Sequence, residues 1–171
     1  DADNGKRALY WYQKAGQKGH LKALNAAAFM MEKGQRVARA PERAAKWYAA
    51  APKGGHLGAQ YRLGIMYEKG DGVNQDHKRA AGWYLKAAKR GHPLAQSAIG
   101  YLFEKGLGIQ KDLKSAMTWY LKGANQGYAK PQYNVGVMYA KGHSIAQDDK
   151  KAVYWLREAA LQNNTEAQRV L

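Results

Sequence analysis

Histidines recur along this 171-residue chain at a spacing that raises the question of a metal site. His20, His56 and His92 lie 36 residues apart. Zinc needs its nitrogen ligands about 2.0–2.1 Å from one ion, whereas packed helices lie about 8–10 Å apart. Because each histidine would belong to a different helix pair, we predict no metal site and interpret the three as packing in turns. His77 and His143 are expected to be exposed loop residues.

Two segments of the form Lys-Gly-x-Gly, at 69–72 and 105–108, raise the question of a phosphate-binding loop. A helix start is expected after each, but no strand precedes them and both recur with the same period, which indicates turn chemistry. No Ser/His/acid arrangement and no pair of acids stands apart from this recurrence. The sequence therefore predicts no cofactor and no catalytic residues, in a protein that is not an enzyme.

The chain is strongly basic, with 28 Lys and Arg against 13 Asp and Glu and a formal net charge of +15. Such a charge favours an acidic protein, an anionic membrane surface or nucleic acid as partner without choosing among them. The segment RAAGWYLKAAKRGH, residues 79–92, mixes basic and aromatic residues as nucleic-acid-binding segments do. The absence of cysteine excludes disulfides and thiolate metal sites, and no apolar run approaches the roughly 20 residues of a membrane-spanning helix.

A 36-residue internal repeat accounts for most of these recurrences. Its clearest marks are the tryptophans Trp11, Trp47, Trp83, Trp119 and Trp155. The half of the unit that precedes each tryptophan repeats as well, since AQYRLGIMYEKGDGV at 59–73 aligns with AQSAIGYLFEKGLGI at 95–109. The Trp-Tyr pair in residues 79–92 is therefore predicted to belong to the scaffold and not to a site.

Each repeat is predicted to form two short helices, because its apolar residues follow a period of 3.6. Ala80, Trp83 and Tyr84 make such a stripe in the second helix. In the first helix a small residue would let a neighbouring helix approach closely; this position holds Ala28, Gly64, Gly100 and Gly136. The predicted helix starts are Pro41, Asp76, Asp112 and Asp148, and the predicted left-handed ends are Gly91 and Gly127.

Helix pairs this short cannot bury their apolar stripes alone, so neighbouring pairs must stack. We therefore predict an all-α fold, an α-solenoid of about four antiparallel helix pairs in a single repeat domain. Residues 1–20 would be a partial unit with the second helix only, 21–56, 57–92, 93–128 and 129–164 the repeats, and 165–171 the start of a further repeat. Because both ends fall within a repeat, we expect the full protein to be longer, with a processed or trimmed N-terminus.

The pattern A-x-x-x-L-G-x-x-Y-x-x-G-x-G-V-x-x-D-x-x-x-A-x-x-W-Y-x-x-A-A-x-x-G-H, nearly complete from Ala59 to His92, resembles the Sel-one-like repeat, a relative of the tetratricopeptide repeat. The resemblance covers essentially the whole chain and implies a right-handed superhelix that binds proteins or peptides. It favours a periplasmic or secreted location, with a cytoplasmic one open, and some bacterial repeat proteins of this kind are immunity proteins that cover the active site of a toxic effector. Unlike the disulfide-bearing bacterial members, this chain has no cysteine.

Partner contacts are expected on the first helix of each repeat, on the side away from its core stripe at 100° per residue. These residues are Asn25, Phe29, Glu32, Tyr61, Ile65, Glu68, Ser97, Tyr101, Glu104, Tyr133 and Val137. The apolar series Phe29, Ile65, Tyr101 and Val137 suits an interface, which favours aromatic anchors. The alternative is that the neighbouring repeat buries this series. In the resembled family the first helices line the concave groove, which favours the binding surface.

The sequence thus predicts a non-enzymatic, monomeric scaffold or adaptor that holds an acidic protein or peptide in its concave groove, with basic residues at the rim. A nucleic-acid or anionic-surface binder is the alternative. It would need Lys and Arg gathered on one face together with exposed aromatic residues. Here most aromatic residues fall in the inward stripes, and basic residues such as Lys78, Lys86 and Arg90 are scattered.

Overall fold

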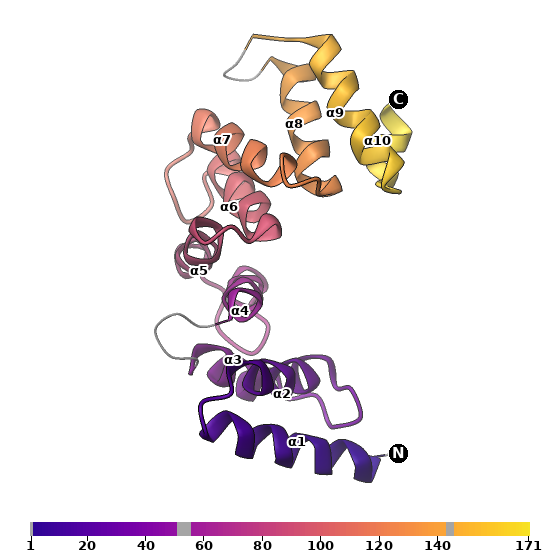
Figure 1. Ribbon diagram of the computed structural model, residues 1–171. Coiled ribbons are helices and arrows are strands. Elements are labelled where there is room, and N and C mark those ends of the chain that lie inside the picture. Colours follow the sequence, from indigo (N-terminus) through magenta and orange to yellow (C-terminus); the bar gives the residue numbers. More distant parts are fainter. Residues whose placement is uncertain (1, 51–55, 143–145) are drawn as a thin grey trace. The chain divides into compact units, whose positions relative to one another are not determined.

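The computed structural model describes residues 2–50, 56–142 and 146–171, and this part of the chain contains ten helices and no strand (Figure 1). His143 lies outside the described residues. The chain divides into two compact units, Asp1–Trp83 and Tyr84–Leu171, each of which is described by itself. The predicted all-α solenoid of antiparallel helix pairs is confirmed, and the predicted single domain with its boundaries stays a prediction.

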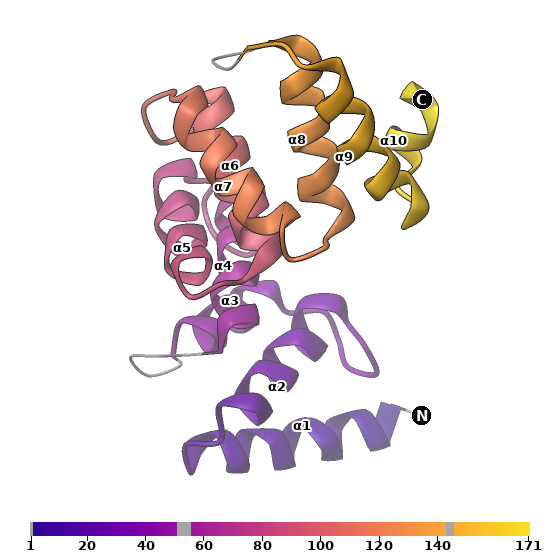
Figure 2. The same ribbon diagram turned by 45° about the horizontal axis from the view of Figure 1, so that its top comes forward.

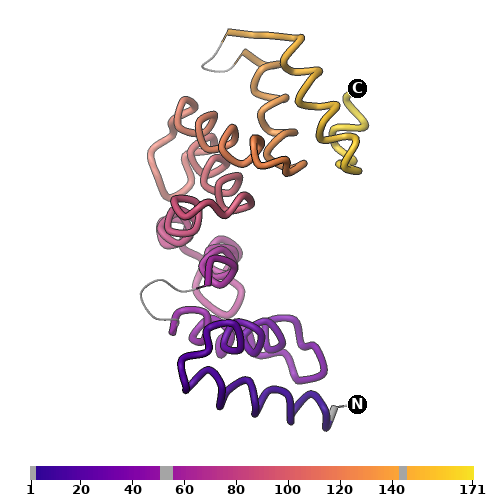
Figure 3. Tube along the Cα trace, in the orientation of Figure 1, coloured from indigo at the N-terminus to yellow at the C-terminus, as the bar shows by residue number. Residues whose placement is uncertain are grey.

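The first unit holds the helices of the chain's N-terminal part. They are α1 (Ala2–Gln17), α2 (Leu21–Lys33), α3 (Pro41–Ala49), α4 (Leu57–Lys69) and the first half of α5 (His77–Lys89). The chain reverses between α1 and α2, as Figure 3 shows, and α2 packs against both α1 and α3. Helices α2 and α4 are the first helices of their repeats, whereas α1, α3 and α5 are second helices.

The second unit holds the rest of α5 and the remaining helices. They are α6 (Pro93–Lys105), α7 (Leu113–Ala124), α8 (Ala129–Lys141), α9 (Asp149–Leu161) and α10 (Thr165–Val170). Helix α6 packs against α7, and α8 lies beside α9 (Figure 2). The first helices α6 and α8 also contact each other, so successive repeats of this unit share a face built from first helices.

The helix starts are fixed by side chains as the sequence predicts. The Asp112 carboxylate accepts hydrogen bonds from the backbone N–H groups of Lys114 and Ser115 at 3.0 and 3.1 Å. Asp76 and Asp148 accept from the residue three positions later, each at 2.9 Å. Such caps satisfy backbone donors that have no partner within the helix. A hydrogen bond from the Ser115 hydroxyl, together with these backbone bonds, lowers the pKa of Asp112, and the bond from the Lys151 backbone N–H lowers that of Asp148, because each bond favours the ionised carboxylate.

The predicted start of α3 and the predicted left-handed glycines are also observed, but the expectation for His77 is not. Pro41 is the first residue of α3, and Gly91 and Gly127 have φ angles of +91° and +83°. The expectation that His77 is an exposed loop residue is wrong, because Asp76 caps α5 one residue earlier and makes His77 a half-buried first residue of that helix. Of the recurrent histidines, His92 accepts a hydrogen bond from the Ala95 backbone N–H at Nδ1 and so caps α6.

The small position of the first helices is where neighbouring helices meet. A Cβ added to Gly100 of α6 would lie 2.7 Å from the ring of Tyr120 on α7. A Cβ added to Gly136 of α8 would lie 2.7 Å from Leu156 on α9. Glycine therefore lets the second helix of the same repeat bury a large side chain directly against the backbone of the first.

The aromatic residues of the second helices are buried unequally. Tyr48, Tyr84 and Tyr120 are buried, and the tryptophans that precede them are half-buried. In α1, by contrast, Trp11 is 66% exposed, because α2 packs on one side of α1 and no other described helix covers the side that carries Trp11. In α3 and α7, which have helices on both sides, the Trp-Tyr pair thus belongs to the packing, whereas in α1 it does not.

Glutamines link the two helices of each repeat in the second unit. Gln126 donates a hydrogen bond to the Gln96 side-chain oxygen at 2.8 Å, and Gln162 donates to that of Gln132 at 2.8 Å, one repeat further on. Gln96 is 5% exposed and also donates to the Ala88 carbonyl. The bonds between glutamines satisfy the buried side chains of Gln96 and Gln132, which are costly to leave unpaired. They hold the two helices of a repeat together, while the Gln96–Ala88 bond reaches the preceding repeat.

We expect Gly100→Ala to destabilise the chain. The added methyl group would meet the Tyr120 ring, which is fully buried, and the Ala116 carbonyl oxygen at 3.2 Å. Overpacking of this kind costs about 1–3 kcal/mol, more than the roughly 1 kcal/mol that alanine gains over glycine in a helix. Chemical denaturation monitored by circular dichroism measures the difference.

The matched control is Gly82→Ala in α5, where an added Cβ has nothing within 4 Å. There the helix propensity acts alone, so the variant should gain about 0.5–1 kcal/mol. Equal effects of the two substitutions would contradict the close approach at Gly100.

Candidate functional site

The predicted contact residues lie on α2 and α4 in the first unit and on α6 and α8 in the second. Most of them are half-buried, and Tyr101 is 40% exposed. Glu32 and Ser97 are buried, at 5% and 2% exposure. Ser97 accepts a hydrogen bond from Asn134 at 3.1 Å. Burial disfavours the charged form of Tyr61 and, with the nearby Glu68, raises its pKa.

In the first unit, a cluster of charged and aromatic side chains joins α2 to α4. The guanidinium carbon of Arg62 lies 4.3 Å from the centre of the Phe29 ring. An N–H group of Arg62 also bonds the Glu32 carboxylate, at 3.3 and 3.4 Å to its two oxygens. Lys33 pairs with the same carboxylate at 2.7 Å. Arg62 therefore covers the predicted anchor Phe29 and neutralises the predicted contact residue Glu32.

In the second unit, the equivalent region between α6 and α8 is a pocket of about 200 Å³. Tyr101, Glu104 and Lys105 line it from α6, and Tyr133, Asn134, Val137 and Lys141 line it from α8. The structure thus brings four of the predicted contact residues, Tyr101, Glu104, Tyr133 and Val137, to one hollow. Lys105 lies 5.8 Å from the centre of the Tyr101 ring and bonds Glu104 at 2.9 Å.

Two of the glutamates on the first helices hold a buried tyrosine of the second helix. The Tyr48 hydroxyl donates to Glu32 at 2.7 Å, and the Tyr120 hydroxyl donates to Glu104 at 2.9 Å. Burial and the adjacent carboxylate raise the pKa of both tyrosines far above the ordinary value. The fourth repeat has Ala140 and Leu156 at these two positions, so acid and hydroxyl are absent together. The acid's first role is therefore to pair with the hydroxyl.

Glu104 remains ionised at neutral pH. Its partial burial alone would raise the pKa of the carboxyl, but hydrogen bonds from Lys105 and Tyr120 and the positive charge of Lys141 lower that pKa below its ordinary value. A carboxylate offers about four acceptor positions. Lys105 bonds Oε1 and Tyr120 bonds Oε2, so the charged group retains capacity for further donors.

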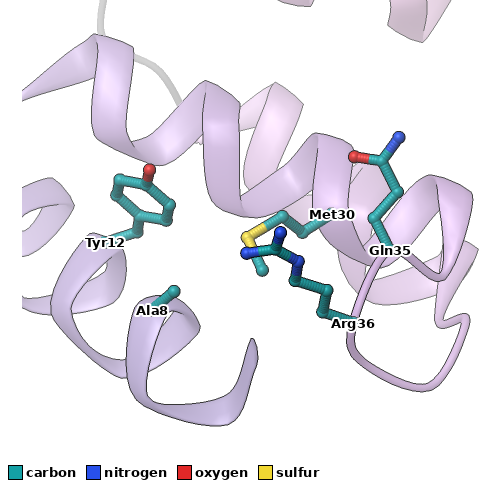
Figure 4. Close-up of a pocket in the computed structure, with 5 residues that line it drawn as sticks. All are labelled: Ala8, Tyr12, Met30, Gln35 and Arg36. Carbon is teal, nitrogen blue, oxygen red and sulfur yellow. The ribbon is translucent and has the colours of Figure 1, made fainter. Parts of the chain in front are cut away.

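A second hollow, of about 520 Å³, lies between α1 and α2 in the first unit (Figure 4). Ala8 and Tyr12 come from α1, Met30 from α2, and Gln35 and Arg36 from the loop after α2. In Figure 4 the Arg36 guanidinium points toward Met30 while Gln35 points away. Met30 is half-buried here although its equivalents Met66, Leu102 and Met138 are buried, so this hollow exposes a core position of the repeat.

The described residues hold no group of three or more His, Asp or Glu side chains placed to bind a metal ion. None of the helices in the same residues is long and apolar enough to cross a membrane. Basic residues recur at one position of the repeat. A lysine is the last residue of α2, α4, α6 and α8, and all four of these lysines, Lys33, Lys69, Lys105 and Lys141, are exposed.

Sequence reasoning missed Arg62, Asn134, Lys105 and Lys141, although the structure places all four beside predicted contact residues. The sequence pattern could have indicated two of them, Arg62 and Asn134. One position of the repeat is occupied in turn by Ala26, Arg62, Ala98 and Asn134. A position that alternates between small and long polar residues within a regular repeat indicates a side chain outside the shared packing.

Stacked antiparallel helix pairs with a 36-residue period define a helical repeat protein. The chain belongs to the Sel1 repeat family, whose model, described as the Sel1 repeat, matches residues 2–20, 21–56, 58–92, 93–128 and 132–164. Proteins built on this scaffold are typically protein-interaction modules and are generally not enzymes. No curated protein matches the chain.

Solved structures of bacterial proteins resemble the chain. A Sel1 repeat protein from Oxalobacter formigenes is 32% identical, with a TM-score of 0.89 over the whole of this chain and 69% of that protein. A protective antigen of uropathogenic Escherichia coli strains is 28% identical, with a TM-score of 0.86 over 94% of this chain. The chain spans 34% of that antigen's length. An immunity protein from Pseudomonas aeruginosa is 22% identical, with a TM-score of 0.59 over 93% of this chain and 59% of that protein, and shares the fold.

The lowered pKa of Glu104 makes stability depend on pH. A carboxyl with a lower pKa in the folded state stabilises the fold above its ordinary pKa, and this contribution is lost as pH falls through the folded value. We expect Glu104→Gln to be less stable than the parent at pH 7, by on the order of 1 kcal/mol. The difference should shrink toward about pH 3, as measured by denaturation at several pH values.

Tyr120→Phe is the companion variant, since it removes one donor and leaves the acid in place. It should raise the pKa of Glu104 toward the ordinary value, which a carboxyl NMR titration reads directly. A stability difference between the parent and Glu104→Gln that does not change with pH would argue against this role of the pair.

Proposed function

We propose that this chain is a non-enzymatic scaffold that binds a protein partner through the face of its first helices that carries the predicted contact residues. The observation that carries the proposal is the α6–α8 hollow, where the 40% exposed ring of Tyr101 stands beside Val137 and Tyr133. Exposed aromatic residues next to a concave, partly apolar surface are typical anchors of interfaces. Phe29 and Ile65 continue the same series in the first unit, where both are half-buried.

The partner surface is proposed to be acidic. Lysines end α2, α4, α6 and α8 and recur every 36 residues, so each of these helices carries a positive charge at the same position beside its predicted contact residues. Each lysine also complements the negative end of its helix dipole, which gives it a structural reason to be there. A net charge of +15 adds a field that attracts acidic proteins and speeds their association.

An immunity protein that neutralises a secreted antibacterial effector is a more specific form of this proposal. Its support is the likeness to the Pseudomonas aeruginosa immunity protein, which is a likeness of fold. A periplasmic or secreted location and a monomeric state belong to the same form of the proposal. The general proposal of an acidic protein partner does not depend on it.

The experiment compares Tyr101→Ala with Tyr128→Ala as bait for proteins of the source organism, followed by direct titration of the captured partner. Tyr128 is the matched control because it belongs to the same unit, is 44% exposed and precedes α8 at its N-terminus. Truncating an aromatic anchor costs about 2 kcal/mol or more, so Tyr101→Ala should weaken binding about 30-fold, while Tyr128→Ala should bind as the parent does.

Nucleic acid is the competing partner, favoured only by the net charge. Nucleic-acid binding would be detected if the protein retained generic DNA and RNA with an affinity that falls steeply as the salt concentration rises. Binding to polyanions alone, with no protein partner, would overturn the proposal. A protein partner that binds Tyr101→Ala and the parent equally would overturn the placement of the surface.

A further inference from the structure

The first unit shows what a filled version of the α6–α8 pocket looks like. Between α2 and α4, the Arg62 guanidinium covers the Phe29 ring at 4.3 Å and bonds Glu32. The same carboxylate accepts a hydrogen bond from the Tyr48 hydroxyl and forms an ion pair with Lys33. The guanidinium thus contacts one aromatic ring and one carboxylate, and the same carboxylate also binds one tyrosine hydroxyl and one lysine.

The second unit repeats this arrangement 72 residues later without the arginine. Tyr101 stands at the position of Phe29, Glu104 at that of Glu32, Lys105 at that of Lys33 and Tyr120 at that of Tyr48. The Tyr120–Glu104 and Lys105–Glu104 contacts are the same as in the first unit. The equivalent of Arg62 is Asn134, a shorter side chain whose amide donates to Ser97.

The pocket of about 200 Å³ lies where the missing side chain would extend, since Tyr101, Glu104 and Asn134 all line it. A water molecule's share of liquid volume is about 30 Å³, so the pocket has room for a planar guanidinium and the methylenes that carry it. Val137 and Met138 supply apolar wall for those methylenes.

We propose that this pocket takes the guanidinium of an arginine side chain from the partner protein. The inference rests on the proposed function and names the chemistry of one contact within it. The arginine would stack on the Tyr101 ring and donate to the Glu104 carboxylate, as Arg62 does with Phe29 and Glu32. A guanidinium fits better than an ammonium because it is planar, stacks on rings and presents several donors at fixed angles.

The lysines beside the pocket do not exclude a second cation. In the first unit the same carboxylate holds Lys33 at 2.7 Å and Arg62 at 3.3 Å, so one glutamate of this scaffold already accommodates both. Glu104 stays ionised and accepts only one hydrogen bond at each oxygen from the described residues. An otherwise acidic partner surface would offset the charge of Lys105 and Lys141 around the inserted arginine.

The test uses blocked single amino acids as probes, namely Nα-acetyl-arginine amide, the matching lysine compound and the matching glutamate compound. NMR signals of Val137 and Met138 report occupancy of the pocket. We expect the arginine probe to shift these signals at millimolar concentration and to bind several-fold more tightly than the lysine probe, while the glutamate probe leaves them unchanged. A stronger response to the glutamate probe would show an anion site between Lys105 and Lys141 and overturn the inference.

The decisive variant is Asn134→Arg, which supplies the guanidinium from the chain itself. It should abolish the response to the arginine probe and weaken capture of the partner by about tenfold, because the partner's arginine loses its cation–π contact with the Tyr101 ring. Asn134→Ala is the matched control, because it removes the same hydrogen bond to Ser97 and leaves the pocket open. It should still respond to the arginine probe, unlike Asn134→Arg.

The outcomes separate the inference from the proposed function. An undiminished probe response in Asn134→Arg would overturn the arginine pocket. If partner binding were still lost in Tyr101→Ala, the binding surface would stand while its arginine contact fell. A partner that ignores both Tyr101→Ala and Asn134→Arg would overturn both.

Discussion

A pair of short helices has no interior of its own, and the whole fold follows from that constraint. Each helix presents one apolar stripe, which can leave water only against the helices before and after it. Close contact requires a small residue at one position of the first helix, and Gly100 and Gly136 supply it under Tyr120 and Leu156. The large side chain of the second helix then lies against the backbone of the first, and this contact sets the spacing on which the remaining interactions depend.

Burying a tyrosine in this way creates a second requirement, because its hydroxyl needs a partner away from water. Glu32 and Glu104 meet it in two repeats, each from the first helix of the same pair. The fourth repeat has Leu156 in place of the tyrosine and Ala140 in place of the acid, so the requirement and its solution disappear together. Glu32 and Glu104 thus serve first as hydrogen-bond acceptors for a buried tyrosine of the neighbouring helix.

Function is therefore to be sought at positions that the packing leaves free. Arg62 belongs to the second repeat, and the equivalent residue of the fourth repeat is Asn134. The aromatic ring, the glutamate and the lysine beside these two residues hardly change. That single exchange converts a filled contact between α2 and α4 into an open pocket between α6 and α8. A regular scaffold can acquire a local site in this way at little structural cost, because the omitted side chain was not part of the core.

The repeat length, the helix pairs, their caps and their glycine contacts follow from the sequence alone, since these depend on local backbone chemistry and on a periodicity repeated over 36 residues. The same periodicity puts Tyr101, Glu104, Tyr133 and Val137 on one face of first helices. Which of the predicted residues already have partners depends on the folded chain: Glu32 is held by Tyr48 and Arg62, and Ser97 by Asn134. Those partners are 16 to 37 residues away in the chain. Helical periodicity gives the face on which a side chain lies, but its partners depend on how one repeat packs on the next.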